Sequence, residues 1–159
     1  MVELSSVPQE APSLTARDVL RQKGSNVITV RPEQGVLEVA RVLAEHSVGS
    51  LLVVDDERNI VGILSERDVT RAMARDLDAL RELKVFELMT RDVIIALESD
   101  TLDSVMALMT TERIRHVPIV SDGRLAGILS IGDIVKAKAA HAEGVVRHLT
   151  DYITGKYPN

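Results

Sequence analysis

Short apolar runs alternate along this chain with stretches whose apolar positions recur every three or four residues. In the first half, the short runs are rich in Val, Ile and Leu, as is typical of buried strands, and they cover residues 26–30, 50–54 and 60–64. The helical spacing covers residues 35–46 and 65–76. A polar turn at 55–59 joins the last two runs and predicts a hairpin. We therefore expect the order strand, helix, strand, turn, strand, helix.

The second half repeats this order. Its matching segments are 92–96, 101–112, 116–120, 125–129 and 130–142. The phrase GILSERD at 62–68 recurs as GILSIGD at 127–133, and residues 27–54 align with 93–120 without a gap. Half-domains of about 60 residues seldom bury enough surface alone. We therefore expect the halves to pack face to face as one pseudo-symmetric α/β unit, with two related clefts between them.

A further helix is predicted before each half, over 15–24 and 83–90, and we expect each helix to lean on the opposite half. Thr15 and Asp18 have the spacing of a capping box, with Asp in place of Glu. Gly24 is the residue type that commonly ends a helix.

The tail after Gly144 predicts a short amphipathic helix with Val145, Leu149 and either Tyr152 or Ile153 on its apolar face. That face needs a partner, which is either the domain or a second chain. The expected domains are a flexible N-terminal lead at 1–14, a first repeat with its preceding helix at 15–76, a second repeat with its preceding helix at 77–142, and a C-terminal amphipathic helix and tail at 143–159.

Composition narrows the classes of partner. The chain has 159 residues, of which 45% are hydrophobic, and this is enough for a core. A net charge of −5 and an aromatic content of 2% argue against nucleic acid, because cations and stacking platforms are scarce. The sequence has no cysteine, no apolar run of about 18 residues and no signal-peptide pattern. We therefore expect a cytoplasmic protein without disulfides or membrane contact.

The sequence contains no pattern typical of an enzyme or a metal site. A Ser-His-Asp order, an HExxH motif and a P-loop are all absent. His141 and His148 lack carboxylates at ligand spacing. An enzyme acting on nucleotides would need a general base beside the phosphate, for which His116 is the only candidate. We therefore predict no catalytic residues and no metal.

The doubled phrases, from VITV to IVGILSERDV and from VIIA to LAGILSIGDIV, resemble a tandem pair of CBS domains. This module was first recognised in cystathionine β-synthase and is also called a Bateman module. The resemblance covers about residues 15–140 and is greatest to small stand-alone bacterial CBS-pair proteins. It implies two βαββα CBS repeats packed face to face, and a homodimer formed through the helices.

The resemblance also implies that the repeated phrase binds an adenosine ligand. In the family, Ser or Thr of this phrase lies beside the phosphate and Asp takes the ribose hydroxyls. Here these residues are Ser65 and Asp68 in the first copy, and Ser130 and Asp133 in the second. A carboxylate can accept both hydrogen bonds from a vicinal diol, and a Ser at a helix N-terminus lies among N–H groups suited to phosphate.

Each cleft, by the same resemblance, draws residues from both copies. Cleft A combines Ser65, Arg67 and Asp68 with Ile94, Arg115 and His116. Cleft B combines Ser130 and Asp133 with Ile28, Val48 and Gly49. Arginine and histidine give cleft A cations for a phosphate, whereas cleft B lacks obvious ones unless Lys23 reaches in. We expect cleft A to bind the phosphate-bearing nucleotide more tightly, and cleft B to take a nucleoside end, to bind weakly or to stay empty.

These features predict a non-catalytic sensor that binds AMP, ADP, ATP or NAD(H). The signal would pass to an unidentified regulated protein or through self-association. The alternative is a ligand-free structural interaction module whose clefts are vestigial. Two alternatives also stay open for single residues. Gly62 and Gly127 serve either close packing or the ligand, and Asp68 and Asp133 are either ligand residues or first-turn helix residues favoured by the helix dipole.

Overall fold

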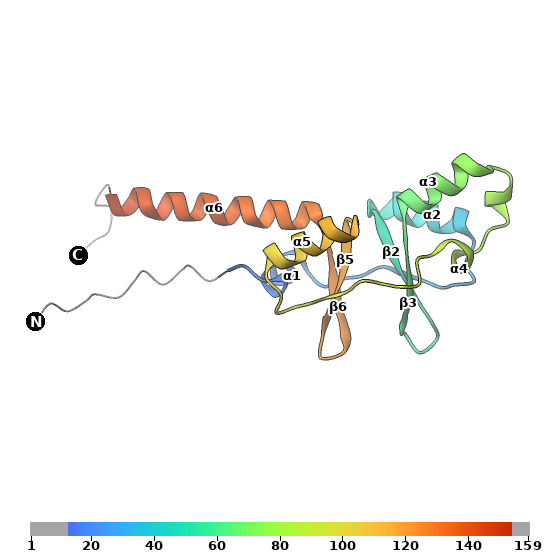
Figure 1. Cartoon of the computed structure of the whole chain (residues 1–159), viewed down its shortest axis with the longest axis horizontal. Helices are drawn as coiled ribbons and strands as arrows, with labels where there is room; N and C mark the ends of the chain where they lie inside the picture. The colour runs from blue at the N-terminus through green and yellow to red at the C-terminus, as the bar shows by residue number, and fades with distance from the viewer. Residues whose placement is uncertain (1–12, 154–159) are drawn as a thin grey trace, which may run out of the picture. The chain divides into compact units, whose positions relative to one another are not determined.

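The computed structural model describes residues 13–153, apart from the side chains of residues 148, 149, 151 and 152 (Figure 1). The chain forms two compact units. The first-repeat unit is Ser25–Ile95, and the second-repeat unit consists of the described residues of Met1–Gly24 and Ala96–Asn159. Each unit is built around one three-stranded sheet covered by helices. The predicted α/β class is therefore confirmed.

The first-repeat unit contains the sheet β1-β2-β3, in which β1 runs parallel to β2 and β2 runs antiparallel to β3. Its elements are β1 (Thr29–Val30), α2 (Val36–His46), β2 (Ser50–Val54), β3 (Ile60–Ser65), α3 (Glu66–Arg75), the 3-10 helix η1 (Ala79–Arg81) and α4 (Val85–Leu88). Parallel neighbours need a long crossover, which α2 supplies. The polar turn forms the predicted hairpin between β2 and β3.

The second-repeat unit has the same topology, with the sheet order β4-β5-β6. Its elements are α1 (Ala16–Lys23), β4 (Ala96–Leu97), α5 (Leu102–Glu112), β5 (His116–Ser121), β6 (Arg124–Ser130) and α6 (Ile131–Ile153). Ser50 is paired with Ser65 in the first hairpin, and His116 with Ser130 in the second. The repeat seen in the sequence therefore extends to the register of the strands.

Each unit has an aliphatic core. The core of the first-repeat unit includes Val36, Val39, Leu43, Leu51, Val53, Leu64, Leu80 and Val85. The core of the second-repeat unit includes Ala16, Leu102, Val105, Met109, Val117, Ile119, Leu129 and Ile134. Burial of these side chains supplies the hydrophobic stabilisation, because the chain has few aromatic residues to contribute.

The helix that precedes each repeat packs against the other repeat, as predicted. Helix α1 contacts β6 and α6, and α4 contacts β3 and α3. A Cβ at Gly127 would lie 2.5 Å from Leu20 Cδ2, and a Cβ at Gly62 would lie 2.5 Å from Met89 Sδ. Glycine leaves room for these side chains beside the last strand of each sheet, whereas any Cβ there would force the leucine or the methionine to shift. Close packing is therefore an established role of the repeated glycine.

The first strand of each repeat is shorter than predicted. The prediction of a strand over 92–96 is wrong for 92–95, because β4 begins at Ala96. Likewise, β1 covers only Thr29–Val30 of the predicted residues 26–30. Each of these edge strands has just two residues paired with its neighbour. β-propensity produces a strand only where a partner continues the ladder, so the remaining apolar residues stay outside the sheet.

The separate helix predicted after Gly144 is also wrong. Helix α6 runs without interruption for 23 residues, with Gly144 in its interior (Figure 1). A glycine costs an α-helix only about 1 kcal/mol relative to alanine, and the preceding alanine-rich sequence favours the helix. The predicted side-chain positions of Leu149 and Tyr152 lie outside the described residues. Neither α6 nor any other helix within residues 13–153 is long and apolar enough to cross a membrane.

Candidate functional site

The first Ser-x-x-Asp phrase lies at the junction of β3 and α3. Ser65 is the N-cap of α3, and its backbone N–H and its hydroxyl donate to Asp68 Oδ2 at 2.8 and 2.6 Å. The N–H of Glu66 donates to the carbonyl of Gly49 at 3.1 Å, which ties the junction to the residue before β2. Ser65 and Asp68 are half-buried, and Arg67 is exposed. A hydroxyl and a carboxylate are thus held side by side at a helix N-terminus.

The second phrase has the same geometry at the junction of β6 and α6. The backbone N–H and the hydroxyl of Ser130 donate to Asp133 Oδ2 at 2.7 and 2.8 Å. The N–H of Ile131 donates to the carbonyl of Arg115 at 2.9 Å. Arg115 matches Gly49 in the sequence alignment of the repeats. The two copies therefore agree in backbone and in side-chain hydrogen bonds.

The same hydrogen-bond pattern occurs in α1, outside both phrases. The backbone N–H and the hydroxyl of Thr15 donate to Asp18 Oδ2 at 2.9 and 2.8 Å, which confirms the predicted capping box. A Ser/Thr-x-x-Asp box can therefore stabilise a helix start without any ligand. In both phrases the serine donates to Oδ2 of the aspartate, as Thr15 does to Asp18.

Lys23, at the end of α1, lies beside Asp133 of the second phrase. Its Nζ donates to Asp133 Oδ2 at 2.6 Å and to the carbonyl of Ile128 at 2.9 Å. The Asp133 side chain is 24% exposed, so solvent screens this ion pair only in part. Burial opposes ionisation of Asp133, but hydrogen bonds from Lys23 and Ser130 outweigh it and lower the pKa of the carboxyl.

The two copies differ at the position of Lys23. Leu20 packs on Gly127 as Met89 packs on Gly62. Lys23 follows Leu20 by three positions and forms an ion pair with Asp133, which gives the second junction a cation beside its carboxylate.

Ser50 is not among the residues predicted to bind the ligand, although it directly follows Val48 and Gly49 of predicted cleft B. It is 7% exposed, and within the described part of the chain its hydroxyl oxygen is buried without a hydrogen-bond partner. A buried polar group normally has a partner, so an orphan hydroxyl points to a water or a ligand. Ser50 aligns with His116, and the two occupy the same register position. The sequence alone sets Ser50 against His116, but only the burial of its hydroxyl distinguishes it as a candidate ligand residue.

The predicted site residues are divided between the two units. The first-repeat unit holds Ile28, Val48, Gly49, Ser65, Arg67, Asp68 and Ile94, and the second-repeat unit holds Arg115, His116, Ser130 and Asp133. Ile28 and Val48 are partly buried against the first core. Each predicted cleft draws residues from both units, so clefts A and B stay predictions. Within the described residues, no group of three or more His, Asp or Glu side chains could hold a metal ion.

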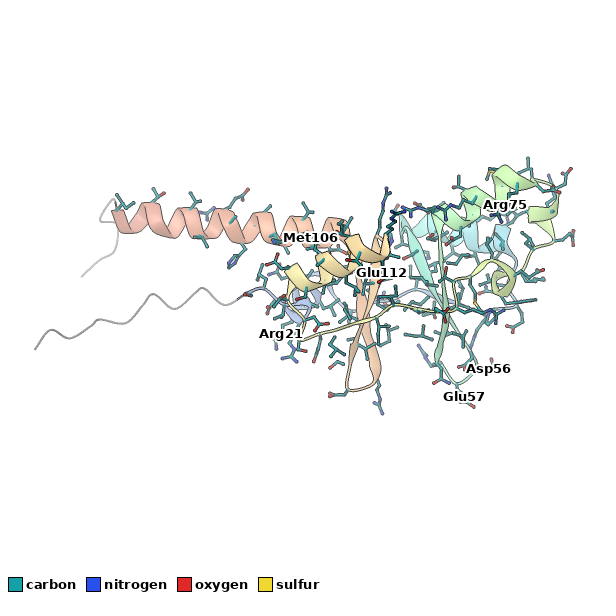
Figure 2. All side chains as sticks on the ribbon, viewed as in Figure 1. Arg21, Asp56, Glu57, Arg75, Met106 and Glu112 are labelled. Carbon is teal, nitrogen blue, oxygen red and sulfur yellow. The ribbon has the colours of Figure 1, made fainter. Side chains whose placement is uncertain are left out.

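The hairpin turn lies at the opposite end of the strands from the phrase. Asp56 and Glu57 are at the tip of the β2–β3 hairpin (Figure 2), whereas Ser65 ends β3. Asp56 Oδ1 lies 3.5 Å from Arg31 Nη1. This turn, residues 55–59, is one residue longer than the matching residues 121–124 of the second repeat. The difference lies away from the two junctions, which stay alike.

Two α/β repeats with matching capped phrases define a tandem-repeat module, and comparison with known proteins identifies its family. The CBS domain model matches residues 16–75 and 85–140. A CBS-domain-containing protein of Agrobacterium tumefaciens is 40% identical in its crystal structure, with a TM-score of 0.76 over 78% of this chain and 98% of that one. The mitochondrial CBS domain-containing protein CBSX3 of Arabidopsis thaliana is 30% identical over 154 residues, 91% of this chain and 74% of that protein. The chain belongs to the CBS-domain family, as a tandem pair.

Two further relatives show the settings in which such pairs occur. The CBS domain pair of protein MJ0100, solved in complex with 5′-methylthioadenosine and S-adenosyl-L-methionine, is 30% identical, with a TM-score of 0.72 over 82% of this chain and 99% of that one. Inosine-5′-monophosphate dehydrogenase of Methanocaldococcus jannaschii is 37% identical over 114 residues, 71% of this chain and 22% of the enzyme. Pairs of this kind therefore bind adenosine compounds in some proteins and form a minor part of an enzyme in others.

Proposed function

We propose that this protein is a non-catalytic regulatory module that binds adenosine-containing ligands at its two Ser-x-x-Asp phrases. The observation that carries the proposal is their equal geometry, in which hydroxyl, carboxylate and helix start recur with the same hydrogen bonds. A helix N-terminus suits a phosphate, and a carboxylate suits a ribose diol. The MJ0100 complex supports the ligand class. AMP, ADP, ATP and NAD(H) are the proposed ligands.

Cleft A is proposed to take the phosphate-bearing ligand. Its members are Ser65, Arg67, Asp68, Ile94, Arg115 and His116. Arg67 lies in the first turn of α3, directly before Asp68, and Arg115 directly precedes β5. Two guanidinium groups and an imidazole match a polyanion, because they supply several charged donors.

Cleft B is proposed to take a nucleoside end. Its members are Ser130, Asp133, Ile28, Val48 and Gly49, to which we add Ser50. Lys23 pairs with Asp133, so their charges largely cancel and leave little positive potential for a phosphate. The buried hydroxyl of Ser50 would gain a hydrogen-bond partner in the ligand.

The output of the sensor is proposed to be a change in self-association or in the affinity for a regulated protein, within the cytoplasm. A ligand shifts such an equilibrium only through different affinities for the two states. Homodimerisation through the helices is supported by an open groove of about 310 Å³ between α2 and α3. The groove is lined by Ala40, Leu43, Ala44, Glu66, Val69 and Thr70. Leu43 and Val69 are buried in the core, so its open surface is formed mainly by the small or polar residues Ala44, Glu66 and Thr70.

A ligand-free interaction module is the second candidate, and one observation favours it. The capping box of Thr15 and Asp18 has the same hydrogen bonds as the two phrases, although it lies outside them. The phrases would then be retained for helix capping alone.

Calorimetric titration with AMP, ATP, NAD and NADH separates the two candidates. We expect saturable binding to the wild-type protein, and a loss of at least tenfold (~1.4 kcal/mol) in affinity at cleft A in Asp68→Ala, because the ribose acceptor is removed. Asp133→Ala tests cleft B in the same way.

Asp18→Ala is the matched control, since it removes the same type of capping box from α1 and leaves both phrases intact. We expect it to lower stability without changing nucleotide affinity. Unchanged affinity in both Asp68→Ala and Asp133→Ala would refute the site assignment. No binding of any of the four compounds would favour the interaction module.

A further inference from the structure

Helix α6 carries an apolar stripe that the rest of the described chain leaves uncovered. Val135, Val146 and Ile153 have exposed fractions of 57%, 63% and 81%. Ala139 and Ala142, which lie between them in the sequence, are also exposed. From the sequence, either the domain or a second chain could cover the apolar face of the C-terminal helix. For these described side chains the domain is not the partner, and an uncovered apolar stripe indicates an interaction surface.

The stripe has the spacing of a coiled-coil seam. Its positions alternate in steps of four and three residues: 135, 139, 142, 146, 149 and 153. In heptad terms, positions 139, 146 and 153 are a, and positions 135, 142 and 149 are d. Position 149 is a leucine in the sequence, and its side chain lies outside the described residues. These six positions are called the α6 seam below.

The α6 seam is separate from the face that anchors the helix. Ile134 is fully buried in the second core, and Ala137 packs against the same core. At 100° per residue, the middle of the seam lies about 100° around the helix from Ile134. The anchored turns already fix the helical conformation, so pairing along the seam does not carry the cost of helix nucleation.

Charges beside the seam favour a parallel pair of identical helices. Lys138 is at position g and Glu143 at the following position e. In a parallel pair, g of one helix lies next to e of the other, which brings opposite charges together on both sides. An antiparallel pair with the same seam would instead place Glu143 near Glu143 of the second copy. Lys138 also forms an ion pair with Asp103 in its own chain, so its ammonium would join a cluster of two carboxylates.

We propose that the α6 seam binds the α6 seam of a second copy as a short parallel two-stranded coiled coil. In this arrangement the a-position side chains of the two copies face one another, and Val146 and Ile153 become buried. The inference depends on neither the adenosine ligand nor the clefts. It adds an interface to the self-association in the proposed function, and cross-linking tests it separately from nucleotide binding.

Cysteine cross-linking of the full chain tests the proposal, because the sequence has no native cysteine. Ala139→Cys and Val146→Cys each place a thiol at an a position. Ala140→Cys and Arg147→Cys are the matched controls, since each places the thiol one residue further around the helix, outside the seam. Under mild oxidation, we expect the two seam variants to form a disulfide-linked dimer at least about tenfold faster than the controls, because disulfide geometry requires close Cβ atoms.

Equal cross-linking of all four variants, or of none, would overturn the proposal. A dimer that forms only in a mixture of Ala142→Cys and Val146→Cys chains would show an antiparallel pair, and would overturn it as well.

Sedimentation velocity tests the charge argument independently of cysteine chemistry. Glu143→Lys brings like charges together in the parallel pair, so we expect the dimer dissociation constant to rise about threefold or more at low salt. Arg147→Glu, a charge reversal outside the seam, is expected to leave the constant within about twofold. An unchanged constant in Glu143→Lys would contradict the parallel register.

Discussion

Single residues decide how closely the helices approach the sheets. Gly127 has no side chain because Leu20 of α1 occupies the space that a Cβ would need. Gly144 has an open environment, in which an added Cβ would meet nothing within 4 Å. The two glycines therefore have different roles, although both lie in the second-repeat unit.

We predict opposite effects of alanine at these two positions. Gly127→Ala is expected to lower the free energy of unfolding by about 1–3 kcal/mol, because the new Cβ overpacks against Leu20. Gly144→Ala is expected to raise it by about 0.5–1 kcal/mol, because alanine is the better helix former. Urea unfolding at constant pH measures both changes. A stability of Gly127→Ala equal to or above that of the wild type would contradict the packing role assigned to this glycine.

At the scale of the elements, carboxylates stabilise the N-termini of α1 and α6. This predicts that the free energy of unfolding depends on pH. Hydrogen bonds from Thr15 lower the pKa of Asp18, and Asp133 has a lowered pKa despite its burial. A carboxyl whose pKa is lower in the folded state contributes stability above its unfolded value of about 3.9, and loses it as the pH falls through the folded pKa. We therefore expect the free energy of unfolding to decrease from about pH 5 downward.

Variants test which carboxylates cause this decrease. Asp18→Asn and Asp133→Asn should each flatten the curve of unfolding free energy against pH, since an amide does not titrate. In a Lys23→Met background, Asp133→Asn should flatten the curve less, because the ion pair is already absent. A curve that keeps its full slope in the Asp18→Asn, Asp133→Asn double variant would assign the acid sensitivity to other groups.

At the scale of the whole molecule, the proposed clefts join residues of the two units. A ligand in cleft A should therefore slow amide hydrogen exchange in both, at the start of α3 in the first-repeat unit and at the start of β5 in the second. Mass spectrometry of the exchanging protein with and without AMP measures this, and Asp68→Ala should abolish the protection. Protection confined to one unit would refute a cleft built from both repeats, even if AMP binds.

The sequence alone was sufficient for the features that depend on local pattern. The doubled order of elements, the two hairpins and the capping box of Thr15 and Asp18 follow from residue spacing over a few positions, and the structure has them all. The Ser-x-x-Asp phrases could also be located, because a motif that occurs twice in the same context is easily recognised. The shared family then suggested what the phrases bind.

Tertiary structure decided what depends on distant parts of the chain. Lys23 and Asp133 are separated by 110 positions and meet only because α1 packs beside β6 and α6. The short length of β4, the burial of Ser50 and the reason for glycine at 127 likewise depend on neighbours that no local pattern specifies. The continuity of α6 through Gly144 was misjudged for a related reason. Glycine lowers the local helix propensity, which suggests a break at position 144. The helix is nevertheless ordered because Ile134 is anchored in the core, and this anchoring exists only in the folded molecule.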